Sequence, residues 1–538
     1  MQDAFDWIVV GAGSAGAVVA GRLAASGAGE VLLLEAGTAN RHPLVRIPKG
    51  IARLVQSPRH CWFYQVESER PEGFPPEVWV RGRGLGGSSA VNGMIWSRGQ
   101  PEDYAGWASL AGAHWDYPNM LATFRALEDH PYGPSERFGA GGPVPITPGG
   151  HPDQWHPLSE AMVAAGEEMG LTRVSELNGH AGPRVGYYSH NIRHGKRVSA
   201  ADAFLAPVRG RPNLEVRTGA LVDRVWFEKD RAAGVEVLLG GRRHRFHCRR
   251  EVVLCAGTLE SPCILQRSGV GPADLLAHLG VPVVADIPAV GRGMREHLSV
   301  AVSYRIRPPG GNHRAFQGLG LAWSATRYLL AGRGPLATGP FEVGGFASLE
   351  DTHPDFQLYL GGYVFRLSDD AHPVPLGNLD PEPGITLYGQ LLRLASEGEV
   401  AIASPDPRVP PRIRPNWLAA EEDRRLAVAA LRYLRQYAHA PPLARHLVAE
   451  LSPGGDLQSD AELLSAFRRL ATSGLHGTGT CRMGRDGEAV VDEQLRVRGV
   501  AGLRVADCSV MPAPISGNTN APAMAVGWRA ADFLLAAR

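Results

Sequence analysis

The chain has few of the features that mark metal-stabilised, disulfide-linked or membrane-spanning proteins. Its 538 residues include only six cysteines, none in a CxxC pair, so neither a zinc site nor a disulfide framework is predicted. No apolar run approaches the ~18 residues of a membrane span. The formal net charge is +1, which gives no reason to expect nucleic acid or an anionic membrane surface. The expected partners are small molecules.

The length predicts two domains, because 538 residues exceed what one hydrophobic core usually serves. With 44% hydrophobic residues, the composition is that of an ordinary soluble globular protein. The first strand begins near Phe5, which leaves no room for a signal peptide. We therefore expect a cytoplasmic protein without an integral membrane segment, with peripheral membrane association left open.

The most informative segment is residues 6–37, DWIVVGAGSAGAVVAGRLAASGAGEVLLLEAG. A short apolar strand at residues 8–10 enters a turn at Gly11, Gly13 and Gly16, which opens a helix. Gly11 allows the tight turn, Gly13 lets the backbone approach a pyrophosphate, and Gly16 lets the helix lie close to the strand. The helix N-terminus then faces the phosphates.

A second strand, residues 31–34, ends at Glu35, about 20 residues past the glycines, where a carboxylate accepts hydrogen bonds from ribose hydroxyls. Its charge would repel a 2′-phosphate, which argues against NADP. Ser14, Ala15 and Ala36 complete the predicted contacts of this unit. Strand, turn, helix, strand and acid in order predict a dinucleotide site, a purely structural βαβ unit being the alternative.

Only one such glycine motif follows a strand, so one dinucleotide is predicted, either NAD or a flavin. The segment RGRGLGGSSAVNGMIWSRG, residues 81–99, is too polar and glycine-rich for a core strand. We expect it to wrap around a ligand. A flavin enzyme needs such extra backbone to enclose its isoalloxazine ring, whereas an NAD enzyme needs its substrate to be the redox partner.

Further elements are predicted from hydrophobic periodicity and from glycine and proline positions. A boundary between lobes is expected in the Pro- and Gly-rich residues 131–157, helices at 159–169 and 421–437, and strands at 214–227, 234–239, 252–254 and 503–506, followed by a C-terminal helix.

Over nearly its whole length the chain resembles the glucose-methanol-choline (GMC) oxidoreductases, a family of FAD enzymes. Four motifs carry this in the family's order: VVGAGSAGAVVAGRL with LLLEAG, RGRGLGGSSAVNGMIWSRG, GTLESPCILQRSGVG, and HGTGTCRMG with VDEQLRVRGVAGLRVADCSVMPAPISGNTNAP. The resemblance implies an α/β fold, α+β overall. It comprises a Rossmann-like FAD-binding domain (1–150, 196–298 and 484–538) and a discontinuous substrate-binding domain on an antiparallel sheet with helices (151–195 and 299–483).

The resemblance assigns catalysis to His476, matching the family's base, and to Asn518 in the SGNTNAP loop. An imidazole with an ordinary pKa of about 6.5 can accept a hydroxyl proton near neutrality. An amide can hydrogen-bond the developing alkoxide. The remaining positions that the resemblance places at the FAD are Gly86, Gly87, Ser88, Asn92, Gly93, Met94, Val222, Ala256, Gly257, Asp507, Thr519 and Asn520.

Three departures from the family pattern bear on cofactor and substrate. Val91 stands where some members carry the histidine that bonds FAD covalently, so a non-covalent flavin is predicted. Gly477 follows the base in place of proline, and residues 293–297 read GMREH instead of Asn-Leu-x-Asp-His. Neither change alters the predicted chemistry.

We expect an apolar primary alcohol rather than a sugar or a quaternary ammonium compound, with candidate wall residues Leu475, Phe341, Phe346, Tyr359 and Phe365. The electron acceptor is oxygen or a quinone or other carrier, and the resemblance to bacterial alcohol and choline dehydrogenases favours a dehydrogenase. Three alternatives stay open: a cyanohydrin-type flavin lyase, a light-driven fatty-acid decarboxylase, and a flavin-holding protein without catalysis.

Overall fold

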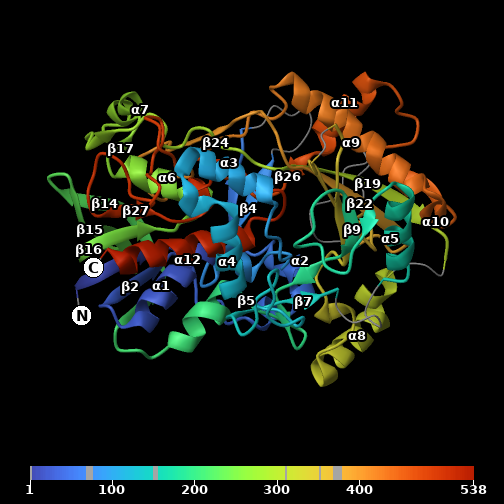
Figure 1. The fold of residues 1–538 in the computed structure, drawn as a ribbon, viewed down its shortest axis with the longest axis horizontal. Helices are drawn as coiled ribbons and strands as arrows, with labels where there is room; N and C mark the ends of the chain where they lie inside the picture. The colour runs from blue at the N-terminus through green and yellow to red at the C-terminus, as the bar shows by residue number, and fades with distance from the viewer. Residues whose placement is uncertain are drawn as a thin grey trace.

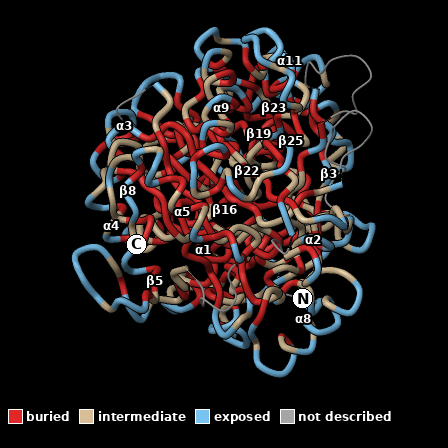
Figure 2. The backbone as a smooth tube through the Cα atoms, turned by 90° about the vertical axis from the view of Figure 1, so that its right-hand side faces the viewer, coloured by how far each residue is buried: buried red, intermediate tan, exposed pale blue. Residues whose placement is uncertain are grey.

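The computed structural model describes residues 3–67, 77–149, 156–308, 312–350, 353–366 and 379–537. Part of the predicted lobe boundary at 131–157 lies outside the described residues. Within them, two large sheets form side-by-side halves of the molecule, each with its own hydrophobic core (Figure 1). Buried backbone fills the centre of the molecule, and exposed backbone is concentrated at the periphery (Figure 2). The mixed α/β fold predicted from the sequence is confirmed.

The first sheet contains seven strands in the described part of the chain, and its centre is parallel. The predicted first strand pairs in parallel with β2 on one side and β16 on the other, so their carboxyl ends meet at one edge. In sheet order the strands are β13 (Leu214–Thr218), β2 (Val31–Glu35), β1 (Ala4–Val10), β16 (Arg242–Leu254), β15 (Arg231–Leu239) and β14 (Ala220–Glu228), with β27 (Leu503–Val505) pairing β16.

The segment predicted as strand at 214–227 is divided by Gly219, whose φ is +70°. Its two parts, β13 and β14, lie at opposite edges of the sheet. Alternation predicted the extended backbone, but the break between the two strands depends on the left-handed conformation that glycine adopts easily.

Helices cover this sheet, and α1 (Ser14–Ser26) packs against the C-terminal α12 (Asn520–Ala536), beside which it runs in Figure 1. The other helices of this half are α3 (Pro101–Ala111), α4 (Tyr117–Leu127), α6 (Gly257–Arg267) and α7 (Ala273–His278), with the short α2 (Ile51–Leu54).

The second sheet contains eight strands among the described residues and is mainly antiparallel. In order they are β25 (Leu447–Ser452), β19 (Leu298–Ile306), β22 (Gly384–Leu391), β21 (Phe356–Gly361), β20 (Val343–Ala347), β9 (Arg184–Tyr187) and β8 (Thr172–Arg173), with β26 (Thr472–Ser473) pairing β19. Its helices are α5 (Ser159–Glu168), α8 (Gly318–Ala331), α9 (Glu421–His439), α10 (Pro441–Ala444) and α11 (Asp460–Leu470).

Two-stranded pairs link these layers: β3 (Cys61–Gln65) with β4 (Val78–Gly82), β5 (Glu128–Asp129) with β6 (Val144–Pro145), β7 (Thr147–Pro148) with β10 (Ser189–His190), β11 (Ile192–Arg193) with β12 (Lys196–Arg197), β17 (Val270–Gly271) with β18 (Ala285–Asp286), and β23 (Glu399–Ala401) with β24 (Arg412–Arg414). The domain limits predicted from the sequence stay a prediction.

Candidate active site and cofactor cradle

The first glycine turn is closely packed except at Gly13. A Cβ on Gly11 would lie 2.5 Å from the carbonyl oxygen of Cys255, and one on Gly16 would lie 1.9 Å from that of Gly11. Gly13 has an ordinary φ of −75°, and a Cβ added there meets no described atom within 4 Å. The space above Gly13, at the N-terminus of α1, is thus open, as a bound phosphate requires.

Glu35 joins this turn to the segment at 81–99. Its Oε2 accepts a hydrogen bond from the N–H of Ala12 at 2.9 Å, and its Oε1 accepts from those of Gly37 at 2.8 Å and Gly84 at 2.9 Å. Sequence reasoning assigned this carboxylate to ribose alone. Because each carboxylate oxygen has two acceptor sites, Oε2 retains capacity for a ribose hydroxyl.

The segment at 81–99 lies directly on the first turn. The Gly86 N–H donates to the carbonyl of Ala12 at 2.8 Å, and a Cβ on Gly87 would lie 2.7 Å from the Cα of Gly13. Ser88 Oγ accepts from the N–H of Gly82 at 3.1 Å. The two glycine-rich segments therefore form one cradle.

Asn92 continues this cradle toward a buried arginine. Its Oδ1 accepts from the N–H of Met94 at 3.0 Å and from Nη1 of Arg197 at 2.8 Å, and Gly93 faces Pro340. Burial lowers the pKa of Arg197 to about 9. Its Nε and Nη2 have no hydrogen-bond partner among the described residues. Such orphaned donors fit the oxygen-rich groups of a dinucleotide, and no pattern in the sequence had marked Arg197.

Asp507 holds a third glycine turn, at Ala256 and Gly257. Its Oδ2 accepts from the N–H of Gly257 at 2.8 Å and from Ser261 Oγ at 2.6 Å, and its Oδ1 accepts from the N–H of Ser509 at 2.8 Å. The Ala256 N–H donates to Ser261 Oγ at 3.1 Å. Asp507 thus holds the N-terminal end of α6. The glycine turn at residues 11–16 lies next to it, because Gly11 packs against Cys255.

The C-terminal loop completes the cradle. Ser14 Oγ donates to Oδ1 of Asn520 at 2.7 Å, and Thr519 is the N-cap position of α12. Val222 is different, since it is buried in β14 opposite Val237. Its assignment to the adenine stays a prediction, as do the roles of the other cradle residues.

His476 and Asn518 meet although 42 positions separate them, with Nε2 of His476 3.2 Å from Nδ2 of Asn518. The amide is held in one orientation. Asn518 Nδ2 donates to the hydroxyl of Tyr359 at 3.0 Å, and Asn518 Oδ1 accepts from Nε2 of Gln357 at 3.1 Å. An N–H group of Asn518 is therefore directed at the lone pair of His476 Nε2.

The other face of His476 meets a second histidine. His476 Nδ1 lies 3.1 Å from Nδ1 of His297, and Gln390 Nε2 lies 2.9 Å from the same His297 nitrogen. Because the amide of Asn518 donates to Nε2, neutral His476 carries its proton on Nδ1, which faces the Nδ1 of His297. This pattern leaves Nε2 as the basic nitrogen.

Glu296 anchors the backbones of both histidines. Its Oε1 accepts from the N–H of His476 at 2.6 Å and from that of His297 at 2.8 Å. Its Oε2 lies 3.5 Å from Arg81, which also donates to the carbonyl of Leu475 at 2.8 Å. Burial raises the pKa of Glu296, and Arg81 opposes that rise.

Burial keeps both histidines neutral. It lowers the pKa of His476 well below the ordinary 6.5, an effect that His297 and Arg81 reinforce. It lowers the pKa of His297 to about 3. At neutral pH the pair consists of two uncharged imidazoles, one of which is a base ready to accept a proton.

Sequence reasoning missed Gln357 and Gln390, which orient this pair. Both are buried, and they face each other across β21 and β22, where Tyr359 likewise faces Tyr388. The available signal was a glutamine within each of the apolar runs FQLYL and TLYGQL, because buried glutamine is uncommon without a partner.

The predicted wall residues divide into two groups. Tyr359 touches Asn518, and Phe341 packs on it with ring centroids 5.2 Å apart. Phe346 is buried, Phe365 packs on Tyr363, and Leu475 is 40% exposed. Of the predicted wall residues, Tyr359 therefore contacts the catalytic pair directly, and Phe341 reaches it through Tyr359.

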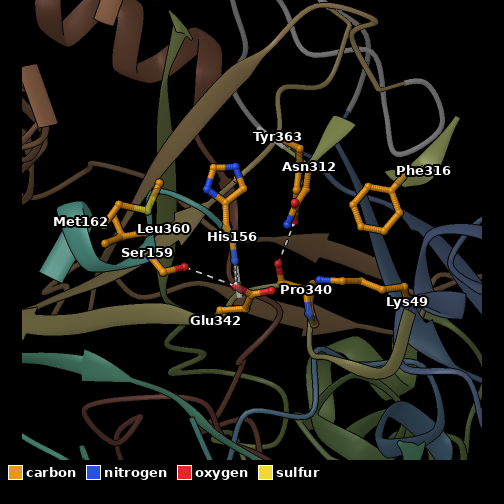
Figure 3. Close-up of a pocket in the computed structure, with 11 residues that line it drawn as sticks. Lys49, His156, Ser159, Met162, Asn312, Phe316, Pro340, Glu342, Leu360 and Tyr363 are labelled. Carbon is orange, nitrogen blue, oxygen red and sulfur yellow. Dashed lines mark hydrogen bonds between the residues drawn. The ribbon is translucent and has the colours of Figure 1, made fainter. Parts of the chain in front are cut away.

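A pocket lined by Lys49, His156, Glu342 and their neighbours shares none of its lining residues with the His476 network. Figure 3 shows Lys49, His156 and Glu342 directed into it. Burial lowers the pKa of Lys49 to about 8 and that of His156 to about 4. The His156 N–H donates to Glu342 at 2.7 Å.

Comparison with known proteins assigns the chain to a family. Family models described as GMC oxidoreductase match residues 5–299 and 395–527. Proteins named oxygen-dependent choline dehydrogenase are 38% identical, from Burkholderia pseudomallei (strain 1710b) over 98% of this chain and 93% of the relative, and from Klebsiella pneumoniae (strain 342) over 98% and 96%. The chain belongs to the GMC oxidoreductases.

Solved structures of other proteins have the same fold as this chain. Pyridoxine 4-oxidase from Mesorbium loti superposes with a TM-score of 0.87 at 32% identity, covering 98% of each chain. A variant of formate oxidase from Aspergillus oryzae RIB40 gives a TM-score of 0.90 at 27% identity, covering 99% of this chain and 98% of the other. The predicted family and FAD cofactor are confirmed, and the protein is an FAD-dependent oxidoreductase of the alcohol-oxidising type. None of the described helices is long and apolar enough to cross a bilayer.

Proposed function

We propose that the protein oxidises a primary alcohol to the aldehyde, with His476 as the base. The observation that carries the proposal is the 3.2 Å contact between His476 Nε2, which bears a lone pair, and the amide of Asn518. A substrate hydroxyl that lies beside this pair and reaches both groups would meet a proton acceptor and a hydrogen-bond donor. Bound FAD supplies the acceptor for the hydride that leaves the carbinol carbon.

The surrounding residues support the proton transfer. When Nε2 takes the proton, His476 becomes a cation whose Nδ1–H still donates to neutral His297, at 3.1 Å. The carboxylate of Glu296 accepts hydrogen bonds from the backbone N–H groups of His476 and His297. The amide of Asn518 stabilises the alkoxide oxygen without competing for its proton. Gln357 and Tyr359 keep that amide from rotating.

The neutral lining favours an uncharged alcohol. The side chains that contact His476 are those of His297, Gln390 and Asn518, and the neighbouring Phe341 and Tyr359 are aromatic. We propose aliphatic or aryl alcohols as the substrate class. Choline is the competing candidate, because it stands in the names of the relatives from Burkholderia and Klebsiella.

Anaerobic reduction of the purified protein tests cofactor use and substrate class together. Aliphatic and aryl alcohols are expected to bleach the flavin absorbance faster than choline or a sugar. A higher rate with charged or polyhydroxylated compounds would reject the substrate class. No bleaching with any alcohol would reject hydride transfer and leave a lyase as the better explanation.

The electron acceptor and the cofactor linkage are also proposals. We propose a dehydrogenase that passes electrons to a quinone or another carrier, and oxygen consumption at the rate of alcohol turnover would show an oxidase instead. We propose a non-covalent flavin. Val91 is buried among Val45, Leu54 and Cys61, and its side chain offers no nucleophilic atom.

The pH dependence of kcat/KM follows from the neutral base. Because the pKa of His476 is lowered, protonation should inactivate the free enzyme only well below pH 6.5. We expect a constant kcat/KM from pH 8 to pH 6. Arg81→Gln should move the acid limb toward pH 6.5, because it removes a charge that opposes protonation, whereas Arg81→Lys should not. A wild-type limb at or above pH 6.5 would contradict the assignment.

A further inference from the structure

Helix α8 presents apolar side chains to solvent. Leu319 is 91% exposed, Trp323 65% and Leu330 83%, whereas Ser324 and Tyr328 are buried. This is the reverse of an ordinary surface helix, which buries its apolar face. In Figure 1, α8 lies at the lower edge of the molecule, and Figure 2 shows exposed backbone around it.

The exposed side chains form one face. Leu319, Trp323 and Leu330 are spaced by four and seven residues, which places them on the same side of a helix. The flanks of α8 are held by Lys49, whose ammonium group donates to the carbonyl of Gly339 and lies 5.9 Å from the ring of Phe316. Figure 3 shows Lys49 beside Phe316. The apolar face is thus fixed outward.

Basic residues surround this face. Residues 297–341 contain five arginines and no aspartate or glutamate. Arg314 and Arg333 flank the helix and are exposed, without an ion pair among the described residues. Lys196 is exposed beside Gly195, where an added Cβ would lie 2.1 Å from the carbonyl oxygen of Gly332, just past α8.

Two acidic residues close to the start of the helix share one arginine. Asp380 and Glu382 both form ion pairs with Arg305, at 3.0 Å and 3.2 Å. Gln317, at the N-cap position of α8, donates to the carbonyl of Asp380 at 3.3 Å. Arg305 balances one of the two carboxylates, and Lys196, Arg314 and Arg333 outnumber the other, so the summed charge of these described residues is positive.

We propose that α8 binds the surface of an anionic lipid bilayer. Trp323 and the leucines enter the boundary between headgroups and acyl chains, and Lys196, Arg314 and Arg333 lie against the anionic headgroups. A second copy of the chain fits this face less well, because dimerisation would bring two basic faces together.

The overall charge of +1 had given no reason to expect such a surface. That value is an average over the chain, and the positive excess at 297–341 is offset by acidic residues elsewhere in the sequence. Lipid binding depends on the local charge within a Debye length of the contact, so the local excess is the relevant quantity.

Co-sedimentation of the flavin-loaded protein with vesicles tests the proposal. Vesicles of phosphatidylcholine with about one third phosphatidylglycerol should bind the protein at least about tenfold more than phosphatidylcholine alone. Lys196→Gln, Arg314→Gln and Arg333→Gln should each lower binding about fivefold, the factor expected for one basic residue near such a surface. Leu319→Gln, Trp323→Gln and Leu330→Gln together should abolish it.

The matched control is Val448→Gln, because Val448 is 60% exposed on β25. It should bind like the wild type, and flavin content should be unchanged in every variant. Equal binding to neutral and anionic vesicles would overturn the proposal, as would full binding by the triple variant. The proposal would also be overturned if sedimentation equilibrium showed a dimer for the wild type and a monomer for the triple variant, since that result assigns the face to a second copy.

Discussion

His476→Ala is expected to lower kcat/KM by about 10²–10⁴-fold while the protein retains its flavin. The substitution removes the imidazole nitrogen that lies beside the amide of Asn518, and the neighbouring His297 cannot replace it. The Nδ1 of His297 is turned toward Gln390 and its pKa is about 3. The loss should appear in the rate of anaerobic flavin bleaching by a saturating alcohol, because that rate reports the hydride step directly.

The flavin spectrum of the variant separates a chemical defect from a binding defect. The cofactor cradle is built from Gly13, Glu35, Gly87 and Asp507, none of which bonds His476, so the yellow colour should persist. His278→Ala, at the exposed end of α7, provides a histidine control that should keep full activity. Near-full activity in His476→Ala would refute its role as base.

Gly13→Val should yield a folded protein that carries no flavin. A valine side chain at this position would fill the open space at the N-terminus of α1, where the phosphates would lie. The backbone conformation at Gly13 is available to valine, and no described atom lies within 4 Å of the added Cβ. The fold should therefore survive, as judged by far-ultraviolet circular dichroism, with absorbance at 450 nm lost.

Gly106→Val is the matched control, because a Cβ on Gly106 also meets no described atom within 4 Å. It lies on α3, away from the glycine turns, so it should purify with a full complement of flavin. A yellow Gly13→Val protein would show that the pyrophosphate approaches elsewhere. An unfolded Gly13→Val protein beside a folded Gly106→Val protein would show that the turn tolerates no side chain.

Local sequence patterns predicted elements in both halves of the molecule. The βαβ unit is specified by neighbours within about 30 residues, because an apolar strand, a glycine turn and a helix rich in alanine and valine each have a local signature. The strands and helices at 8–10, 31–34, 159–169, 252–254 and 421–437 are all present. The break at Gly219 was missed because strand alternation continues across it.

The family resemblance identified His476 and Asn518. The residues that orient this pair could not be predicted from the local sequence. Gln357 and Gln390 become partners only through the register of β21 against β22. That register is set by the packing of the whole second sheet, and the sequence of either strand alone does not identify its partner. His297 was noticed only as part of a divergent motif, although it contacts His476.

The contact between Ser14 and Asn520 joins positions 506 residues apart, and Arg22 reaches Trp528 and Asp532 in the same way. During synthesis, the βαβ unit leaves the ribosome long before its partner helix α12. The cradle cannot close on the flavin until α12 has been made, so a chain truncated before α12 should remain colourless however well its first strands have paired.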